Sequence, residues 1–179
     1  MLVHEARLTG SSMLKSHTIM RFALAAFMLA GSCAGTVTVH AQQAQSGQTQ
    51  KLEVEKLAIV TGQGRFEFDA EIADEPREHA TGLMFREKMA PNAGMLFDFG
   101  AVRSVTMWMR NTPLPLDMVF IRPDGTVAGI SERTTPFSID IIESPEPVSH
   151  VLELNAGIAR MIGLKVGDQV EHRSLTKDQ

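Results

Sequence analysis

The stretch GRFEFDAEIAD, residues 64–74, decides the fold class because its apolar residues alternate with charged ones. A period of two is typical of an antiparallel strand with one face on the core and one face in water. The preceding segment KLEVEKLAIVT, residues 51–61, is also strand-like, and the glycines at 62 and 64 predict a hairpin turn between the two. The side chains on the predicted apolar face are Phe66, Phe68, Ala70 and Ile72.

Outward from this strand, the period changes to that of a helix in ADEPREHATGLMFREKM, residues 73–89. Asp74 can cap the helix, and Pro76 suits its first turn. Gly82 interrupts the pattern, either for close packing or as a stop signal. We therefore expect a short helix of two or three turns.

The remainder of the chain returns to strand-like segments separated by turn signals. The pair Asp124-Gly125 predicts a hairpin between DMVFIR and TVAGIS. TTPFSIDIIESPEPVS, residues 134–149, holds three prolines and is expected to be a surface loop. The region 150–173 indicates a strand, a short helix opened by residues 155–157, a turn and a last strand. Further strands are predicted at GMLFDF, residues 94–99, and SVTMWMR, residues 104–110.

These segments amount to about seven or eight short strands and two short helices, without βαβ alternation, a phosphate loop or an internal repeat. The pattern predicts a mainly β fold, a compact antiparallel β-sandwich or barrel-like single domain over residues 51–173. Residues 174–179 are expected to form a disordered tail.

Residues 1–41 have the pattern of a secretory signal, with basic residues before the apolar run 22–39. Cleavage after Ala41 would leave a polar, flexible linker at 42–50 and no transmembrane segment in the mature chain. Two alternatives are an uncleaved membrane anchor, near the lower length limit of about 17 residues, and a lipoprotein acylated at Cys33. We expect an exported protein, periplasmic or secreted.

The charge and cysteine content exclude several functions for the mature chain. Residues 1–41 hold one acidic and three basic side chains, so 21 acidic and 17 basic residues become 20 and 14, a net charge of −6. An acidic domain without basic clusters argues against nucleic acid as a partner. Cys33 is the only cysteine, which leaves the mature chain no disulfide and no thiolate site. We expect a monomer without a cofactor.

Six short motifs occur in one order and at close spacing. Together they resemble the family called domain of unknown function 192, which comprises small bacterial and archaeal proteins that often carry export signals. The resemblance covers about residues 52–172; it implies a compact β-rich fold and no established reaction. Arg110 stands where many members carry Lys, which keeps the charge and gains a bidentate fork. The motifs are GLMFR (82–86), GMLFDF (94–99), WMRNTPLPLDMVFI (108–121), DGTV (124–127), VLELNAG (151–157) and GDQV (167–170).

The stretch SVTMWMRNTPLPLDMVF, residues 104–120, sets polar residues beside strongly apolar ones. A strand over its first half would put Trp108 and Arg110 on one face. The prolines that follow must leave the sheet, and Asn111 suits a turn there. Asp117 begins the next strand. These polar groups either satisfy an irregular turn or form a site for a small polar ligand such as a sugar, with Trp108 as a stacking platform.

Arg86 and Glu153 extend this candidate ligand-binding set. Arg86 either pairs with a carboxylate such as Asp117 or Glu153, or clamps an anionic group of a ligand. Alternation puts Glu153 on the face opposite Leu152 and Leu154, where it either meets water or joins Asp117 as an acid–base pair.

Three functions therefore stay open. The leading hypothesis is a non-enzymatic module that binds a small polar or saccharide-like ligand, a partner protein or another envelope component, with no catalytic residue assigned. A second is an enzyme that acts on a glycan or envelope substrate through Asp117 and Glu153. The third is a Cu(I)-binding protein through Met107 and Met109. The scattered histidines and serines predict neither a zinc site nor a hydrolase triad, so no metal site is assigned.

Overall fold

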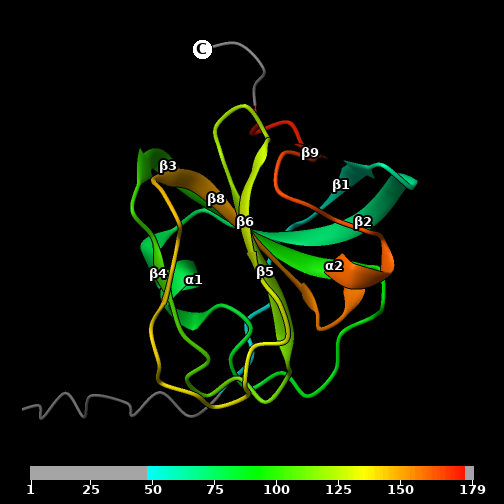
Figure 1. Cartoon of the computed structure of the whole chain (residues 1–179). Helices are drawn as coiled ribbons and strands as arrows, with labels where there is room; N and C mark the ends of the chain where they lie inside the picture. Colours follow the sequence, from blue (N-terminus) through cyan, green and yellow to red (C-terminus); the bar gives the residue numbers. More distant parts are fainter. Residues whose placement is uncertain (1–47, 176–179) are drawn as a thin grey trace, which may run out of the picture. The chain divides into compact units, whose positions relative to one another are not determined.

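The computed structural model describes residues 48–175, which form a curled seven-stranded sheet and a small two-stranded sheet (Figure 1). The large sheet has the order β6-β5-β8-β3-β2-β1-β9. The mainly β prediction is confirmed. The large sheet comprises β1 (Val54–Thr61), β2 (Gly64–Ala73), β3 (Ala93–Arg103), β5 (Leu116–Ile121), β6 (Val127–Ser131), β8 (Val148–Asn155) and β9 (Gln169–Glu171). The small sheet pairs β4 (Thr106–Met107) with β7 (Ile142–Glu143), and the helices are α1 (Pro76–Thr81) and α2 (Ile158–Met161).

The first hairpin forms as its alternation predicts. β1 and β2 pair antiparallel across the turn at 62–63, with Leu57 opposite Phe68. β2 then pairs with β3 in parallel, with Ala70 opposite Gly94, because α1 and its following loop carry the chain back to the start of the sheet. The other strand pairs of the described residues are antiparallel, as the mostly antiparallel prediction expects.

The two edges of the large sheet meet near the β5–β6 turn. Thr126 forms a bridge to Gln169, and the Val170 N–H donates to the Gly125 carbonyl at 2.8 Å. Gly125 has φ +83°, and a Cβ there would lie 2.4 Å from the Val170 carbonyl oxygen. The predicted Asp124-Gly125 turn is therefore confirmed, and it also brings β9 against β6 so that the sheet curls into a partly closed barrel.

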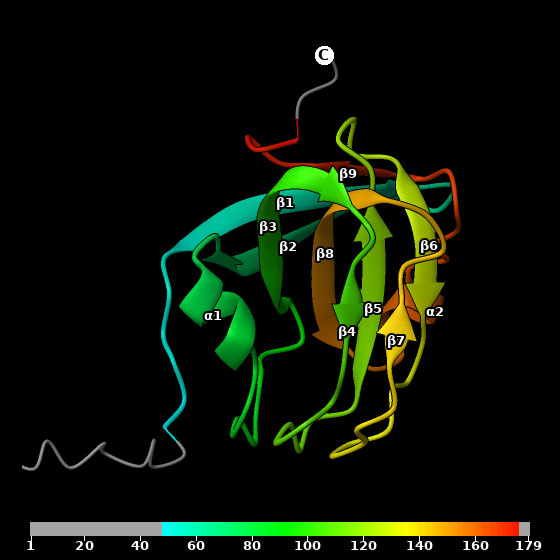
Figure 2. The ribbon, with the colours of Figure 1, turned by 90° about the vertical axis from the view of Figure 1, so that its left-hand side faces the viewer.

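Two apolar cores lie on the two faces of this sheet. The inner core fills the barrel and includes Leu96, Val119 and Leu152, together with residues of α2. The outer core covers the other face of β3, β8 and β5, and includes Phe97 and Met118. Figure 2 shows the β4–β7 pair in front of β8 and β5, and α1 beside β3. β5 and β8 are consequently buried on both faces, like strands of a three-layered fold.

The helices are shorter than their sequence signals indicate. α1 has six residues, and its N-cap is Glu75 rather than Asp74, in a capping box with Glu78. It ends at Gly82, which takes φ +48°, so the predicted stop signal is confirmed. Gly157, at φ +91°, opens α2.

Two irregular regions also differ from prediction. In the segment SVTMWMR, residues 104–110, only Thr106–Met107 forms a strand. The strand ends there because the Met109 N–H donates to the Ser138 carbonyl oxygen and the chain then turns. The predicted loop 134–149 contributes β7 and the start of β8.

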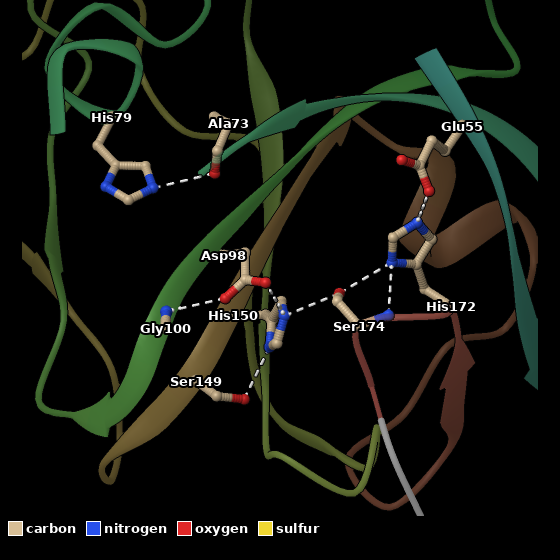
Figure 3. Close-up of polar contacts among 9 residues, drawn as sticks. All are labelled: Glu55, Ala73, His79, Asp98, Gly100, Ser149, His150, His172 and Ser174. Atoms are coloured by element: carbon tan, nitrogen blue, oxygen red, sulfur yellow. Dashed lines mark hydrogen bonds and ion pairs between the residues drawn. The ribbon is translucent and has the colours of Figure 1, made fainter. Parts of the chain in front are cut away.

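A polar network closes one end of the barrel (Figure 3). The Ser174 hydroxyl lies 3.0 Å from His150 Nε2 and 2.9 Å from His172 Nδ1, and His172 Nε2 lies 3.0 Å from a Glu55 carboxylate oxygen. Leu175 is buried in the inner core. Ser174 and Leu175 thus pack on the domain, although the sequence suggested a tail there.

The expected signal at 1–41, with its cleavage and acylation alternatives, lies outside the described residues, as do 42–47 of the linker and 176–179 of the tail. Between residues 48 and 175, no helix has the length and apolarity needed to cross a membrane.

Candidate functional site

A cleft of about 210 Å³ opens on the outer face of the sheet, between α1 and β4. Its walls come from α1 and the following turn, from β3 and from β4, and β8 contributes one residue, Glu153. Besides Ala80, its lining consists of aromatic rings (His79, Phe97, Phe99, Trp108), thioethers (Met84, Met107), threonines (Thr81, Thr106, Thr112), Gly82, Arg103 and Glu153. An apolar cleft with a few polar groups is the usual form of a small-molecule site.

Glu153 is the most buried polar side chain of the cleft, with 4% of its surface exposed. It lies on β8 between Met95 of β3 and Met118 of β5, and these neighbours offer it no hydrogen-bond donor. Burial raises the pKa of Glu153 to about 8, and no charge or hydrogen bond within residues 48–175 opposes this effect. The carboxyl group is therefore mostly protonated at pH 7, with a donor and an acceptor free for a ligand.

The aromatic walls are held in place by contacts with each other. The rings of His79 and Phe99 have centroids 4.9 Å apart, and Phe97 stacks on Phe99 at 6.4 Å. His79 Nε2 lies 2.9 Å from the Ala73 carbonyl oxygen, so this nitrogen carries a proton (Figure 3). Arg103 places its guanidinium carbon 4.6 Å from the Phe99 ring centroid. The rings thus form a preorganised apolar surface.

Trp108 forms part of the mouth of the cleft and is 46% exposed. Burial alternates as predicted: Val105 and Met109 are buried, whereas Trp108 and Arg110 are exposed. The guanidinium carbon of Arg110 lies 5.6 Å from the Trp108 ring centroid, within cation–π range. Trp108 and Arg110 are therefore neighbours, as predicted, and Trp108 lines the same cleft as Glu153.

Asn111 belongs to the loops beside the cleft. It takes φ +55°, a conformation that Asn tolerates better than most residues. Its carbonyl accepts a hydrogen bond from the Phe85 N–H at 2.8 Å, and its side-chain amide lies 3.8 Å from Met84 Sδ. Asn111 thus lies in a turn, as predicted, and it also ties the loop after α1 to the loop after β4.

Asp117 lies on the opposite face of the sheet from Glu153. In the β5–β8 register, Asp117 faces Leu154 and Met118 faces Glu153, so alternation sends the two carboxyl groups to different sides. Asp117 is fully buried and accepts hydrogen bonds from the N–H groups of Arg133, Gly157 and Ala159, at 2.8, 2.8 and 2.9 Å. The hypothesis of an Asp117–Glu153 acid–base pair is wrong, and Asp117 holds the start of α2 in place.

Arg86 also lies away from the cleft. It makes a bidentate pair with Glu71, at 2.5 and 2.6 Å, and donates to the Gln50 carbonyl at 2.7 Å. Burial alone would raise the pKa of Glu71, but Arg86 and the Leu52 N–H lower it overall. The predicted ion pair exists, but its partner is Glu71 rather than Asp117 or Glu153.

The two methionines of the Cu(I) hypothesis have different environments. Met109 is 1% exposed in the outer core, and the Thr134 hydroxyl donates to its sulfur at 3.1 Å. Met107 lines the cleft. Because Met109 is enclosed and already engaged, the pair does not form a thioether site. Among the described residues no group of three His, Cys, Asp or Glu side chains could hold a metal ion.

Sequence reasoning did not place His79, Phe97, Phe99 or Arg103 in the site. One signal was available in GMLFDF, where residues on both strand faces are apolar. Such a strand needs a cover on its second face, and the cleft lies where α1 and β4 supply that cover.

Known proteins resemble this chain in sequence and in fold. Residues 58–172 match the family model of domain of unknown function 192, described as an uncharacterized ACR. A crystal structure from Sinorhizobium meliloti 1021, described as a candidate transcription regulator, is 46% identical with a TM-score of 0.69, covering 72% of this chain and all of that one. A protein of unknown function from Novosphingobium aromaticivorans DSM 12444 is 33% identical with a TM-score of 0.67, covering 72% and 94%. No curated protein matches the chain.

Proposed function

We propose that this chain, which belongs to the domain of unknown function 192 family, is a binding module for a small saccharide-like ligand. The description of the family names no reaction. The observation that carries this proposal is the cleft itself. An exposed Trp108 stands at its mouth, and the carboxyl group of Glu153, which has no hydrogen-bond partner among residues 48–175, opens into it. Sugars present an apolar ring face and several hydroxyl groups, which match a Trp platform and a protonated carboxyl group.

The size of the cleft supports a ligand of one sugar ring. Its volume is about 210 Å³. Drug-sized ligands usually occupy about 300–1,000 Å³. The ligand is therefore a monosaccharide, or the terminal residue of a longer chain that continues past Trp108 into solvent.

The polar groups of the cleft favour binding over catalysis. Glycoside hydrolysis uses a pair of carboxyl groups on either side of the scissile bond. Glu153 is the single carboxyl group among the residues that line the cleft. Asp117, the partner that the enzyme hypothesis required, is on the other face of the sheet and has its own hydrogen bonds. We therefore assign no reaction to the cleft.

The proposed setting is outside the cytoplasm, periplasmic or secreted, on the strength of the signal-like residues 1–41. The charge of this chain argues against the role of transcription regulator that the description of the Sinorhizobium protein carries. The chain after residue 41 has a net charge of −6, whereas DNA-binding surfaces are strongly basic.

Trp108 is the only tryptophan of the chain, so its fluorescence reports directly on the cleft. A titration with a panel of monosaccharides should give a saturable change in Trp108 emission. Trp108→Ala should weaken binding by about tenfold or more in calorimetry, because stacking on the indole ring is lost.

Phe137→Ala is the matched control. Phe137 is also an exposed aromatic residue, at 63%, but it does not line the cleft. Its substitution should leave affinity unchanged. If no sugar shifts the emission of Trp108, or if both variants bind like the parent protein, the cleft is not a sugar site.

A further inference from the structure

Building on the proposed function, we propose that the ligand carries a protonated amine that pairs with Glu153, so that the cleft selects amino sugars over neutral sugars. Residues 48–175 bury two carboxyl groups, those of Asp117 and Glu153. Asp117 receives three backbone N–H bonds. Glu153 receives no hydrogen bond from the same residues, and its carboxyl group opens toward the cleft.

Every fully buried side-chain nitrogen or oxygen atom among residues 48–175 has a hydrogen-bond partner, so the unpaired oxygens of Glu153 reach the cleft. In Glu153 the missing partner is on the cleft side, since Met95 and Met118 flank it within the sheet. A ligand group that enters the cleft can supply it. An ammonium group offers three donors and the opposite charge, whereas a hydroxyl group offers one donor and no charge.

The charge balance of the cleft also favours a cationic ligand group. Within residues 48–175 no cation lies beside Glu153, and the other charged or titratable groups of the lining are His79 from α1 and Arg103 from the end of β3. Arg103 is engaged with the Phe99 ring, and β4 and β5 contribute no titratable group to the lining. A ligand amine is therefore the natural counter-ion for an ionised Glu153.

The aromatic walls add to this preference. Faces of Trp and Phe rings attract cations because of their quadrupole. Two cations of the protein already use rings of this cleft, Arg103 over Phe99 at 4.6 Å and Arg110 over Trp108 at 5.6 Å. An ammonium group inside the cleft meets the same kind of surface, with the carboxylate of Glu153 in addition.

Ionising Glu153 for such a ligand requires little. With a pKa of about 8, roughly one molecule in ten is ionised at pH 7, so the ion pair needs to offset only about a tenfold bias. Binding of the ammonium form then drives the proton off Glu153 into the buffer. A neutral sugar leaves that proton in place.

Three matched probes test this inference: glucosamine, glucose and N-acetylglucosamine, titrated by calorimetry at pH 7 in two buffers of different ionisation enthalpy. Glucosamine should bind roughly tenfold tighter than the other two, and its binding should release about one proton. Glu153→Gln, which resembles the protonated acid in shape, should remove both the preference for glucosamine and the proton release.

The outcomes separate the two proposals. Equal binding of the three sugars without proton release overturns the amine inference and leaves the sugar-binding proposal standing. Failure of every sugar to bind overturns both. Should Glu153→Gln fold poorly, the proton count in the parent protein decides the matter by itself, since a count near zero with bound glucosamine contradicts the pairing.

Discussion

The two faces of the central sheet each bury one carboxyl group, on neighbouring strands and one register position apart. Asp117 of β5 points toward α2 and the inner core, where three backbone N–H groups bind it. Glu153 of β8 points into the outer-face cleft, where nothing in the described residues binds it. Their exposed fractions, 0% and 4%, are nearly the same.

The difference between these acids lies in their partners and not in their burial. Asp117 is part of the scaffold because its removal would leave three backbone donors unsatisfied. Glu153 is part of the site because the fold itself makes no use of its polar atoms. Burial alone would have classed them together.

The largest effect that tests this contrast is the loss of Asp117. Asp117→Ala should lower the free energy of unfolding by roughly 5 kcal/mol, since each of three unsatisfied buried N–H groups costs about 1–3 kcal/mol. Urea denaturation followed by circular dichroism measures the loss. Asp117→Asn retains one acceptor oxygen and should lose about half as much. A loss below about 2 kcal/mol for Asp117→Ala would mean that the three hydrogen bonds to Asp117 contribute little to stability.

The second effect is the pH dependence that Glu153 imposes. The pKa of this group is raised from 4.5 to about 8 on folding, so between these values the folded state holds one proton more than the unfolded state. Stability contributed by the protonated group is therefore full below about pH 4.5 and is lost as pH rises toward 8. Between pH 5 and pH 8 the loss should approach roughly 4 kcal/mol, at about 1.4 kcal/mol per unit.

The measurement is urea denaturation at pH 5 and pH 8 for the parent protein and Glu153→Gln. The variant cannot titrate at this position, so the difference between the two pH slopes isolates Glu153. Identical slopes would show that the carboxyl group is solvated or paired in solution, against the structure.

Much of the fold follows from local patterns in the sequence. The alternation at 64–74 gives β2, the Asp124-Gly125 turn gives the β5–β6 hairpin, and Gly82 ends α1. The parallel pairing of β2 with β3 does not follow, because it depends on where α1 delivers the chain and not on any local period. The two-residue β7 is too short to produce a period at all.

For the candidate site, alternation along a strand predicts the face on which each side chain lies, but it does not predict which elements cover that face. Alternation correctly places Glu153 on the face opposite Leu152 and Leu154, and Trp108 on an exposed face. It cannot tell whether the face of Glu153 is wet or covered, because the cover comes from α1 and β4, distant in sequence. Nor can it show that Asp117, next in register, points the other way.

A third, smaller effect comes from His150, which lies on β8 at the end of the barrel. In contrast to Glu153, His150 has a hydrogen-bond partner at each of its two ring nitrogens (Figure 3). Burial lowers the pKa of His150, and Asp98 partly offsets this. The unfolded state then binds the proton more readily, so stability falls as pH drops below about 6.5, opposite in sign to Glu153. His150→Gln should flatten this acid limb in urea denaturation at pH 6.5 and below. An unchanged limb would assign the acid sensitivity to other groups.

The smallest effect concerns Arg110, which does not line the cleft but lies over Trp108 at its mouth. Its guanidinium lies over the exposed Trp108 ring at 5.6 Å, and a cation–π contact at an exposed site contributes about 0.5–1 kcal/mol. Arg110→Ala should therefore change the free energy of unfolding by less than about 1 kcal/mol and change sugar affinity only about twofold. Arg110→Lys should keep most of the contact, and calorimetry of all three proteins compares them. A loss as large as that of Trp108→Ala would move the recognition of the ligand from the interior of the cleft to its mouth, and Arg110 would then join Glu153 as a determinant of the site.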